Sequence, residues 1–323
     1  MSSDSFGRNE TISPVVVVGS ANMDMVVSCR RFPEPGETVM GTDFGMYPGG
    51  KGANQAAACG RLGGRVRLIA RMGRDVFRDR LSESLGEKGI DLSHVILDDA
   101  EPTGVALITV DSTGENEIIV VGGSNMRLSP RDVRTHRAAF EQAGVVALQL
   151  EIPLETVIEA ARQGKQAGAQ VILNPAPARE LPDELLELVD VLTPNESEAE
   201  LLSGVSVTDT ASAEAAARAL MERGVRCVII TLGAQGALLV TESQSRSFEA
   251  LQVQAIDATA AGDAFTGALA YGLSRGETVE DAIERAIAVS AFAVTRMGAQ
   301  TSMPSPEELD AFITDIKALN QSA

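Results

Sequence analysis

The stretch VVALQLEIPLETVIEAARQGKQAGAQVIL, residues 145–173, decides the fold of this 323-residue chain. It opens and closes with apolar runs, Val145–Leu150 and Gln170–Leu173, that predict buried strands. Between them, Leu154–Gln166 has apolar residues at helical spacing. A strand, a helix and a second strand in this order form a parallel pair, and parallel sheets are covered by helices on both faces. The stretch therefore predicts an α/β protein with a doubly wound, mostly parallel sheet flanked by helices.

The same alternation continues in both directions along the chain. After the last predicted strand, Gly233–Gly236 leads into Ala237–Val240 in the manner of a hairpin. The other predicted strands are Val15–Val18, Val66–Ala70, Val189–Leu192 and Cys227–Thr231. The other predicted helices are Gln55–Leu62, Val76–Lys88, Ala213–Arg223 and Ala264–Leu273.

Two segments interrupt this rhythm and predict a small β-sheet lid. Met23–Tyr47 is extended chain with a turn at Pro33–Gly36, and Gly104–Asn125 contains the strands Val105–Val110 and Glu117–Val121. Both segments suggest antiparallel strands inserted near the ligand end of the main sheet. The predicted division is an α/β body at 15–22, 48–103 and 126–319, a lid at 23–47 and 104–125, and disordered tails at 1–14 and 320–323.

The charge balance excludes some classes of partner. The chain has 27 basic and 45 acidic residues, a net charge of −18, which repels nucleic acid and acidic membranes. An anionic ligand would therefore need a local positive device such as a helix N-terminus. The polar stretch Met1–Pro14 lacks the apolar core of a signal peptide, and no apolar run approaches a membrane span. We expect a cytoplasmic protein.

The cysteines and histidines exclude other kinds of site. Three widely spaced cysteines, Cys29, Cys59 and Cys227, form neither a disulfide framework nor a CxxC motif. The two histidines, His94 and His136, are far apart in the sequence. A site with several histidine ligands, and a Ser-His-Asp triad, are therefore not expected.

Polar side chains follow nearly every predicted strand. In open α/β sheets, ligands bind beyond the carboxyl ends of the strands, so these groups are expected to converge on one site. Their amide and carboxylate chemistry favours a hydroxyl-rich or phosphate-bearing ligand. The residues are Asn22, Asp24, Glu151, Asn174, Asn195, Glu198 and the turn Gly233–Gly236.

The segment Gly45–Gly52 nearly matches a Walker A phosphate-binding loop. Gly52 replaces the Ser or Thr that would bind Mg²⁺, and the segment does not follow a core strand, so we reject that interpretation. A glycine pair, Lys51 and Asn54 remain at the start of a helix, where a small polar molecule can approach closely. A glycine-rich turn with a helix cap would explain the glycines but not Lys51.

The segment Asp257–Gly267 is the richest in chemistry. A helix is expected to begin near Gly262, with free backbone N–H groups at Ala260, Ala261 and Gly262 forming an anion hole. Asp263 lies in the first turn, where a carboxylate stays ionised and can accept a proton from a hydroxyl. The alternative is that Asp263 only caps the helix.

Asn195 and Glu198 share one face of a predicted helix. The alternative is purely structural, because Thr193-Pro-Asn-Glu196 already fits a capping box to which Asn195 would belong.

Six motifs occur in an order that resembles the ribokinase-like carbohydrate kinase family. The resemblance runs from about Val15 to about Ile316. The motifs are Asn22-Met-Asp24, Gly49-Gly-Lys-Gly-Ala-Asn54-Gln, Asn174-Pro-Ala-Pro-Ala-Arg-Glu-Leu-Pro, Thr193-Pro-Asn-Glu-Ser-Glu198, Thr231-Leu-Gly-Ala-Gln-Gly236 and Asp257-Ala-Thr-Ala-Ala-Gly-Asp263.

The resemblance implies a phosphotransferase that moves a phosphoryl group from ATP to the 5-hydroxyl of D-ribose, giving ribose 5-phosphate. It implies that Asp263 is the base and that the amides of Ala260, Ala261 and Gly262 hold the transferring phosphate. The implied sugar contacts are Asn22, Asp24, Gly50, Lys51, Gly52, Asn54, Glu151 and Asp263. The implied nucleotide contacts are Asn195, Thr231, Leu232, Gly233, Ala234, Gln235, Gly236, Gly262 and Ile287.

The resemblance also implies two metal ions. Glu198 would belong to the Mg²⁺ network through water, and Asp257 would hold K⁺ with backbone oxygens. The other implied K⁺ residues are Thr259, Ala293, Arg296, Gly298 and Ser302. Ile287 departs from the family, which often has a polar residue there, so we expect apolar packing beside the adenine.

Other functions stay open. A sibling kinase for 2-deoxyribose, fructose or a nucleoside such as adenosine is distinguished by Asp24, because a carboxylate suits vicinal hydroxyls. A non-catalytic sugar sensor would not need Asp263. An NAD-binding protein lacks support, since no G-x-G-x-x-G follows the first strand. Exposed strand edges in the lid favour a homodimer.

Overall fold

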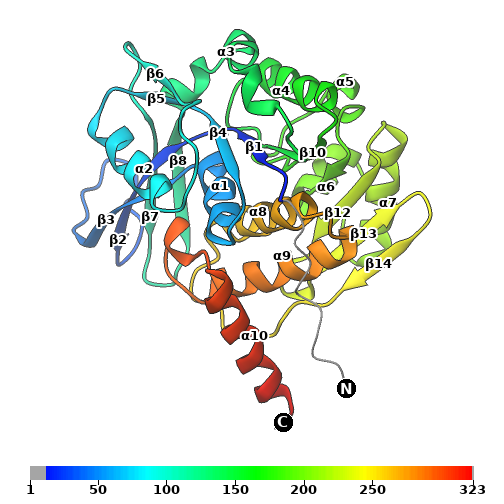
Figure 1. Cartoon of the computed structure of the whole chain (residues 1–323). Coiled ribbons are helices and arrows are strands. Elements are labelled where there is room, and N and C mark those ends of the chain that lie inside the picture. Colours follow the sequence, from blue (N-terminus) through cyan, green and yellow to red (C-terminus); the bar gives the residue numbers. More distant parts are fainter. Residues whose placement is uncertain (1–11, 322–323) are drawn as a thin grey trace.

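A mostly parallel sheet of eight strands forms the centre of the computed structural model, which describes residues 12–321 (Figure 1). The strand order is β14-β13-β12-β11-β10-β9-β1-β4, with only β13 and β14 antiparallel to their neighbours. This confirms the predicted fold class. The strands are β1 Val15–Val18, β4 Val66–Ile69, β9 Val145–Leu148, β10 Gln170–Leu173, β11 Val191–Leu192, β12 Cys227–Thr231, β13 Ala237–Thr241 and β14 Ser245–Phe248.

Helices cover both faces of this large sheet because successive side chains of each strand point to opposite sides. In β1, Val15 and Val17 join one buried core, while Val16 and Val18 join the other. The first core includes residues of α1 Lys51–Arg61, α2 Val76–Gly86, α8 Ala261–Ser274, α9 Val279–Val294 and α10 Pro306–Gln321. The second includes residues of α3 Pro130–Thr135, α4 Leu154–Gln166, α5 Asp183–Leu186, α6 Glu196–Ser203 and α7 Thr210–Glu222.

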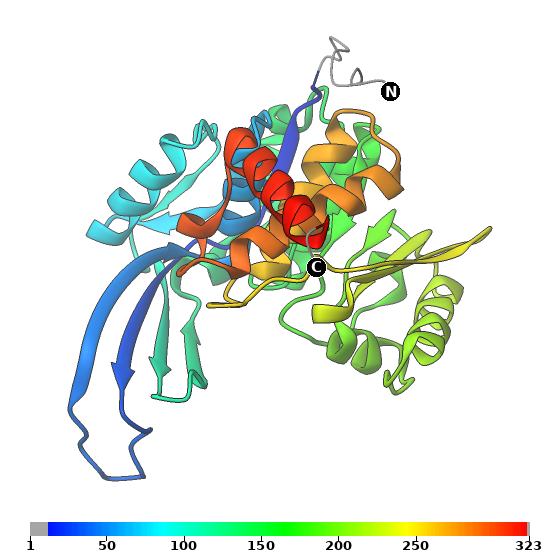
Figure 2. The same cartoon turned by 90° about the horizontal axis from the view of Figure 1, so that it is seen from below.

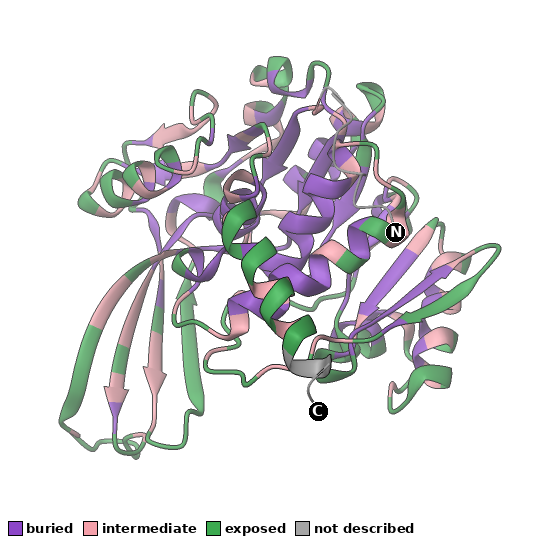
Figure 3. Ribbon diagram, turned by 60° about the horizontal axis from the view of Figure 1, so that its bottom comes forward, coloured by how far each residue is buried: buried purple, intermediate pink, exposed green. Residues whose placement is uncertain are grey.

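A second, smaller sheet extends from one side of the body (Figure 2). Its strands are β2 Asn22–Cys29, β3 Gly41–Gly49, β7 Gly104–Val110 and β8 Asn116–Val121, in the order β3-β2-β7-β8. We call it the small sheet. The two hairpins are antiparallel as predicted, but β2 and β7 join them in parallel. In Figure 3 it is largely pink and green, whereas the large sheet is purple.

Several boundaries differ from the sequence predictions. Helix α1 begins at Lys51, not at Gln55, and β9 ends at Leu148 because the chain then leaves the sheet toward the site. A short parallel pair, β5 Arg71–Gly73 and β6 Ile96–Asp98, was not predicted. The 3-10 helices are η1 Gly123–Arg127, η2 Arg137–Phe140, η3 Gly233–Gln235 and η4 Gln300–Ser302.

The chain ends and the cysteines bear on other predictions. Helix α10 continues to Gln321, so residues 320 and 321 are helical. Residues 12–14 of the other predicted tail are also ordered, since Ser13 N donates to Ser274 O at 3.0 Å and Pro14 O accepts from Gly144 N at 2.9 Å. The remaining parts of the predicted tails, at 1–11 and 322–323, lie outside the described residues. All three cysteines are free. Within residues 12–321, no helix is both long enough and apolar enough to cross a membrane.

The two histidines, distant in the sequence, lie together in space. The Nδ1 atoms of His94 and His136 are 3.3 Å apart. The distance between the two histidines in the sequence was therefore a poor guide to their distance in space. The prediction itself concerned a metal site with several histidine ligands, and this pair supplies two imidazoles.

Candidate active site

A cavity of about 220 Å³ lies at the carboxyl ends of the parallel strands. It brings together the start of α1, the start of α8, residues that follow β10 and β11, and the last residue of β12. This is the edge at which the sequence predicted a ligand. The lining residues are Lys51, Asn174, Ala176, Thr193, Asn195, Glu198, Thr231, Ala258, Ala260, Ala261, Gly262, Asp263 and Thr266.

Asp263 lies in the first turn of α8 and is only 4% exposed. Its two carboxylate oxygens have separate donors: Asn54 Nδ2 donates to Oδ2 at 3.0 Å, and Gln55 Nε2 donates to Oδ1 at 3.2 Å. Burial raises the pKa of Asp263 above its ordinary value, although Lys51 and both amides oppose the shift. The sequence placed a readily ionised carboxylate here; the structure makes it a stronger proton acceptor than an exposed aspartate.

Lys51 is the cation of the site. The chain has only four lysines, and this one, the first residue of α1, lines the cavity beside Asp263. Asp263 raises the pKa of Lys51 most, against the effect of burial, and Glu151, Glu198 and Asp24 add to the increase. Lys51 therefore stays protonated among carboxylates and can meet an incoming anion.

Glu151 is held at the root of the small sheet. Its Oε2 accepts hydrogen bonds from Ser20 Oγ at 2.6 Å, from Lys51 N at 3.2 Å and from Asn22 Nδ2 at 3.4 Å. The residues that follow β1 and β9 meet here because those two strands are neighbours in the large sheet. Three donors on one oxygen fix the direction in which the carboxylate points.

Asp24 lies on β2, next to Gly49 of the paired strand β3. A Cβ atom on Gly49 would come within 2.1 Å of Asp24 Oδ2, so only glycine leaves space for this carboxylate. Burial raises the pKa of Asp24 to about 7, and Glu151 and Asp263 add to the increase against Lys51. Asp24 is therefore electrostatically coupled to Asp263, although it comes from the small sheet.

The site glycines have two different explanations. Gly50, at φ +87°, would place a Cβ 2.6 Å from Asn22 N, and Gly52 would place one 2.7 Å from Ser20 N. These two glycines let α1 pack against the chain after β1. By contrast, a Cβ on Gly262 would meet no protein atom within 4 Å. Packing does not require glycine at Gly262, so the free space there suits a ligand.

The N-terminus of α8 corrects one prediction. Ala260 adopts a left-handed conformation, φ +60°, which is strained for a residue with a side chain. This turn directs the N–H of Ala261 to Ala258 O at 3.2 Å, so Ala261 does not offer the free amide that the sequence predicted. Among the described residues, the amide N–H of Gly262 has no acceptor, and it lies in the positive end of the helix dipole.

The loops after β11 and β12 form the other side of the cavity. Asn195 and Glu198 make a reciprocal capping box, in which Asn195 Oδ1 accepts from Glu198 N at 2.8 Å and Glu198 Oε2 accepts from Asn195 N at 2.9 Å. The predicted box at Thr193–Glu196 is therefore displaced by two residues, because Asn195 is the N-cap. Thr231 is held beside it by a hydrogen bond from its N to Pro194 O at 2.9 Å.

The structure does not bring every predicted nucleotide residue to the cavity. Leu232 is buried, and Ile287 packs into the first core from α9; neither lines the cavity. Gly233 and Gly236 both have positive φ and shape the turn around η3, so their conformation explains them without a ligand.

Asp257 joins two segments next to the cavity. Its Oδ1 accepts from Thr259 N at 2.9 Å, and its Oδ2 accepts from Gly298 N at 2.8 Å. The main chain next to Ala293 is near the same turn, since Val294 O accepts from Ile256 N at 2.7 Å and from Asp257 N at 3.1 Å. Ser302 Oγ donates to Ala299 O. Across residues 12–321, no group of three or more His, Cys, Asp or Glu side chains is arranged to hold a metal ion.

Several polar residues of the site were missed in the sequence. Gln55 connects Asp263 to two further amides. Gln149 Nε2 donates to Gln55 Oε1 at 2.6 Å, and Gln55 Nε2 donates to Asn174 Oδ1 at 3.3 Å. Ser20 was also missed. Gln149 and Ser20 follow strands by one or two residues, so the rule that ligands bind at strand ends was a signal for both.

Three comparisons identify the family. The family model described as pfkB family carbohydrate kinase matches residues 13–306. The chain is 42% identical to a ribokinase of Haemophilus influenzae, over 93% of this chain and 98% of the relative. It is 37% identical to a deoxyribokinase of Salmonella typhi, over 93% and 98%. The structure of Arabidopsis thaliana ribokinase complexed with ribose and ATP superimposes with a TM-score of 0.88 at 34% identity, covering 94% of this chain and 99% of that one. The chain belongs to the pfkB family of carbohydrate kinases.

Proposed function

We propose that this chain transfers the γ-phosphoryl group of ATP to the 5-hydroxyl of D-ribose. The observation that carries the proposal is the buried Asp263, fixed by Asn54 and Gln55, in one cavity with the cation Lys51 and with the N–H of Gly262, which has no acceptor among the described residues. The relatives named as ribokinases, and the neighbour complexed with ribose and ATP, support this substrate pair.

The sugar side is assigned by its hydrogen-bonding groups. Asn22, Asp24 and Glu151 meet at the root of the small sheet, and Asn54 Oδ1 is buried with no partner among the described residues. Carboxylates and amides of this kind bind vicinal hydroxyls. The proposed sugar contacts are Asn22, Asp24, Gly50, Lys51, Gly52, Asn54, Glu151 and Asp263.

The chemical step needs one base and a stabilised phosphate. Asp263 takes the proton of the 5-hydroxyl, the hydroxyl oxygen forms a bond to the γ-phosphorus, and the bond from that phosphorus to the β,γ-bridging oxygen breaks to release ADP. The N–H of Gly262 and the Lys51 ammonium stabilise the negative charge on the moving phosphoryl group. The amide N–H of Ala260 is proposed to assist, whereas that of Ala261 would first have to leave Ala258.

Glu198 is the residue that fits a Mg²⁺ ion. Its carboxylate is buried and lines the cavity, and burial raises its pKa. Because the described residues offer no cluster of three ligands, the ion would be held by the nucleotide phosphates and by water next to Glu198. When bound, Mg²⁺ would neutralise charge on the phosphate oxygens. The proposed nucleotide contacts are Asn195, Thr231, Gly233, Ala234, Gln235, Gly236 and Gly262, with Leu232 and Ile287 as packing behind them.

Asp257 fits a K⁺ ion only together with main-chain oxygens. It already ties the chain before α8 to the chain after α9, so an ion collecting carbonyls there would stiffen the start of α8. We expect K⁺ to raise turnover above Na⁺ at matched ionic strength, and Asp257→Ala to remove the difference. Equal rates in K⁺, Na⁺ and a bulky organic cation would exclude the site.

The small sheet is proposed to act as a lid and as a dimer interface. It carries Asp24, and it leaves the apolar residues Phe44, Leu107 and Ile119 exposed. Closure would exclude water from the phosphoryl group, and a second copy would cover the apolar surface. Hydrogen exchange with and without ribose tests the lid: unchanged protection in β2, β3, β7 and β8 would contradict it. A cytoplasmic location is part of the same proposal.

An assay of ADP release over a panel of sugars and nucleosides tests the proposed function. D-ribose should be used with an efficiency at least ~10²-fold above 2-deoxyribose, fructose and adenosine, because a missing hydroxyl leaves buried partners unpaired. The deoxyribokinase relative makes 2-deoxyribose the second candidate. Equal efficiency with 2-deoxyribose would reject the ribose assignment and leave the sugar kinase intact.

A further inference from the structure

Asn125 is a buried amide that the chemistry above does not use. It lies in η1, directly after the small sheet, and is 1% exposed. Its Oδ1 accepts from Ala21 N at 3.0 Å, and its Nδ2 donates to Ala21 O at 3.2 Å and to Asn22 Oδ1 at 2.7 Å. All three bonds of this side chain go to the two residues where the chain enters β2.

The hydrogen bond from Asn125 to Asn22 decides which end of the Asn22 amide faces the proposed sugar. Because Asn22 Oδ1 is taken by Asn125, Asn22 Nδ2 must point the other way, where it lies 3.4 Å from Glu151 Oε2. An amide NH₂ group is a donor only. Asn22 can therefore offer a sugar an N–H group but not its carbonyl oxygen.

The surrounding backbone leaves space for this pair of amides. Gly104, the first residue of β7, pairs with Asn22 across the small sheet. A Cβ on Gly104 would lie 2.2 Å from Asn22 Oδ1 and 2.3 Å from Asn125 Nδ2. The glycine is thus required where β2, β7 and the end of β8 converge on the two amides.

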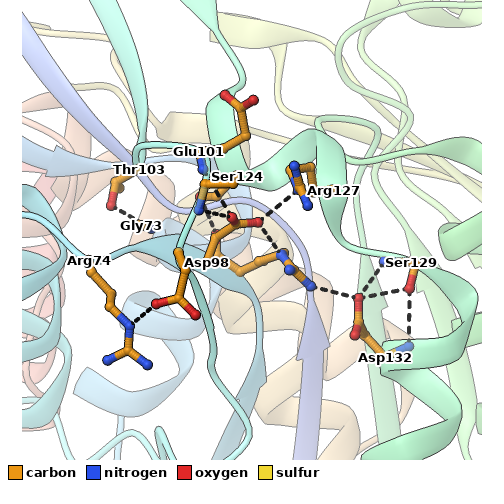
Figure 4. A network of polar contacts seen from close by, with 12 residues as sticks. Gly73, Arg74, Asp98, Glu101, Thr103, Ser124, Arg127, Ser129 and Asp132 are labelled. Carbon is orange, nitrogen blue, oxygen red and sulfur yellow. Dashed lines mark hydrogen bonds and ion pairs between the residues drawn. The ribbon is translucent and has the colours of Figure 1, made fainter.

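The body holds η1 on both sides of Asn125. On one side, Ser124 Oγ donates to Arg71 O at 2.8 Å. On the other, Arg127 Nε lies 3.0 Å from Asp98 Oδ2, a carboxylate that also accepts from Arg71 Nε at 2.6 Å (Figure 4). Asp98 is buried and Arg71 is nearly so, whereas the side chain of Arg127 is half exposed, so the pair with Arg71 is the better shielded of the two; together they hold η1 against the body.

The anchor extends further into the body. Arg71 also pairs with Asp132 at 3.2 Å, and Asp132 completes the capping box of α3 with Ser129 (Figure 4). Burial alone would raise the pKa of Asp98, but the N–H groups of Ala100 and Glu101 and the Arg71 guanidinium lower it to about 2. The network therefore stays charged at neutral pH.

We propose that Asn125 is a positioning residue for sugar recognition. It fixes the amide of Asn22 so that Nδ2, and not Oδ1, faces the sugar, and the Asp98 network fixes Asn125. The proposal rests on the proposed function, which places the sugar at Asn22.

The test is Asn125→Asp, which keeps the shape of the side chain but replaces the donor by an acceptor. Repulsion then turns the Asn22 amide over, so that its oxygen faces Glu151 and the sugar. We expect the KM for the sugar to rise by at least ~10-fold, with kcat and the KM for ATP within ~2-fold of the wild type. Asn125→Ala, which adds no charge, should raise the sugar KM by less.

The matched control is Ser124→Ala. Ser124 is as buried as its neighbour and its hydroxyl anchors the same short helix, but it has no bond to Asn22. Because the Arg127–Asp98 ion pair still holds η1, this variant should change the sugar KM by much less than Asn125→Ala does. A double-mutant cycle tests whether Asn125 acts through Asn22 or only stabilises the fold. If it acts through Asn22, Asn125→Ala should have no further effect on the sugar KM in an Asn22→Ala background.

The outcomes separate this inference from the proposed function. Each variant is measured with the sugar that the wild type uses best in the panel, so a substrate other than ribose overturns the proposed function without affecting this test. An unchanged sugar KM in both Asn125 variants would overturn the inference. So would equal increases in the two KM values, or an effect that persists in full without the Asn22 side chain. If Asn125→Asp does not fold, Asn125→Ala and the cycle decide.

Discussion

The two sheets of this chain contain strands of the same apolar residue types, but these residues are buried in the large sheet and exposed in the small sheet. β1 consists of four valines and all are buried, whereas β8 contains Ile118, Ile119, Val120 and Val121 and all six of its residues are exposed. Helices cover both faces of the large sheet, but the outer part of the small sheet has no cover among the described residues (Figure 3). Apolar composition predicts a strand, but it does not tell whether the same chain supplies the cover.

The difference also divides the site. The body supplies the cavity, with Lys51 at the start of α1 and Asp263 in the first turn of α8, while the small sheet supplies Asn22 and Asp24. If the two regions have these separate roles, substitutions in the body should mainly lower kcat, and substitutions in the small sheet should mainly alter sugar binding or the oligomeric state.

The largest effect is expected on the body side, for Asp263→Asn. Removal of the base should lower kcat by at least ~10²-fold and leave ATP binding and the melting temperature nearly unchanged. Asp281→Asn is the matched control, because Asp281 also lies in the first turn of a helix but is exposed. Steady-state kinetics with both variants checks this, and near-normal turnover of Asp263→Asn would reduce Asp263 to a helix cap.

The next effect is expected on the small sheet, for Asp24→Ala. The efficiency with ribose should fall by ~10²-fold, and the efficiency with 2-deoxyribose should fall much less, because the lost carboxylate binds vicinal hydroxyls. Asp43→Ala, an exposed aspartate on β3, should leave both unchanged. A parallel loss with the two sugars would contradict the assignment of Asp24.

A smaller effect is expected from pH, again through Asp24. Burial, with Glu151 and Asp263, raises the pKa of Asp24 to about 7, so the empty site holds a proton on Asp24 below that pH. A protonated carboxyl group is a poorer acceptor of hydrogen bonds from sugar hydroxyls than a carboxylate. The Kd for ribose should therefore rise as pH falls below about 7, by up to about tenfold per unit.

Calorimetry without ATP measures this pH dependence apart from the chemical step. Asp24→Asn, which cannot titrate, should bind ribose more weakly at high pH and show a flat profile. A flat profile in the wild type would show that Asp24 is not the titrating group in sugar binding.

The smallest effect on turnover is expected from charges on β8. Ile118→Glu combined with Ile119→Glu should convert the proposed dimer into a monomer and change kcat by less than ~3-fold, because β8 carries no proposed catalytic group. Light scattering measures the mass, and Leu201→Glu on an exposed part of α6 is the control. A wild type that is already monomeric would refute the interface.

The sequence predicted most strands of the large sheet because their burial is local and continuous. β1, β10 and β12 have the predicted bounds. The edge strand β14, Ser245–Phe248, was not predicted, because three of its four residues are exposed. The start of α1 was missed because Gly52 is a poor helix former, and its conformation is stabilised by packing against the chain after β1. The three-residue strands β5 and β6 are too short to give a periodic signal.

The site residues at strand ends were predictable, but the side chains that orient them were not. Gln149 reaches Asp263 through Gln55, and Asn125 reaches Glu151 through Asn22. Such chains of amides depend on atoms that are distant in the sequence and close in space. The free amide expected at Ala261 failed for a related reason, since the left-handed Ala260 is a consequence of the folded loop.

The parallel pairing of β2 with β7 has a consequence for the order of folding. The hairpins β2–β3 and β7–β8 each close over a short loop. Their union pairs residue 22 with residue 104, and the chain between the hairpins contains α1, α2 and the three strands β4, β5 and β6. Closing a long loop is slower than forming a hairpin. The small sheet, and with it the proposed sugar contacts on β2, should therefore assemble last, after the intervening chain has packed. A pulse-labelling experiment during refolding should find the amides of β2 and β7 protected after those of β1 and β9.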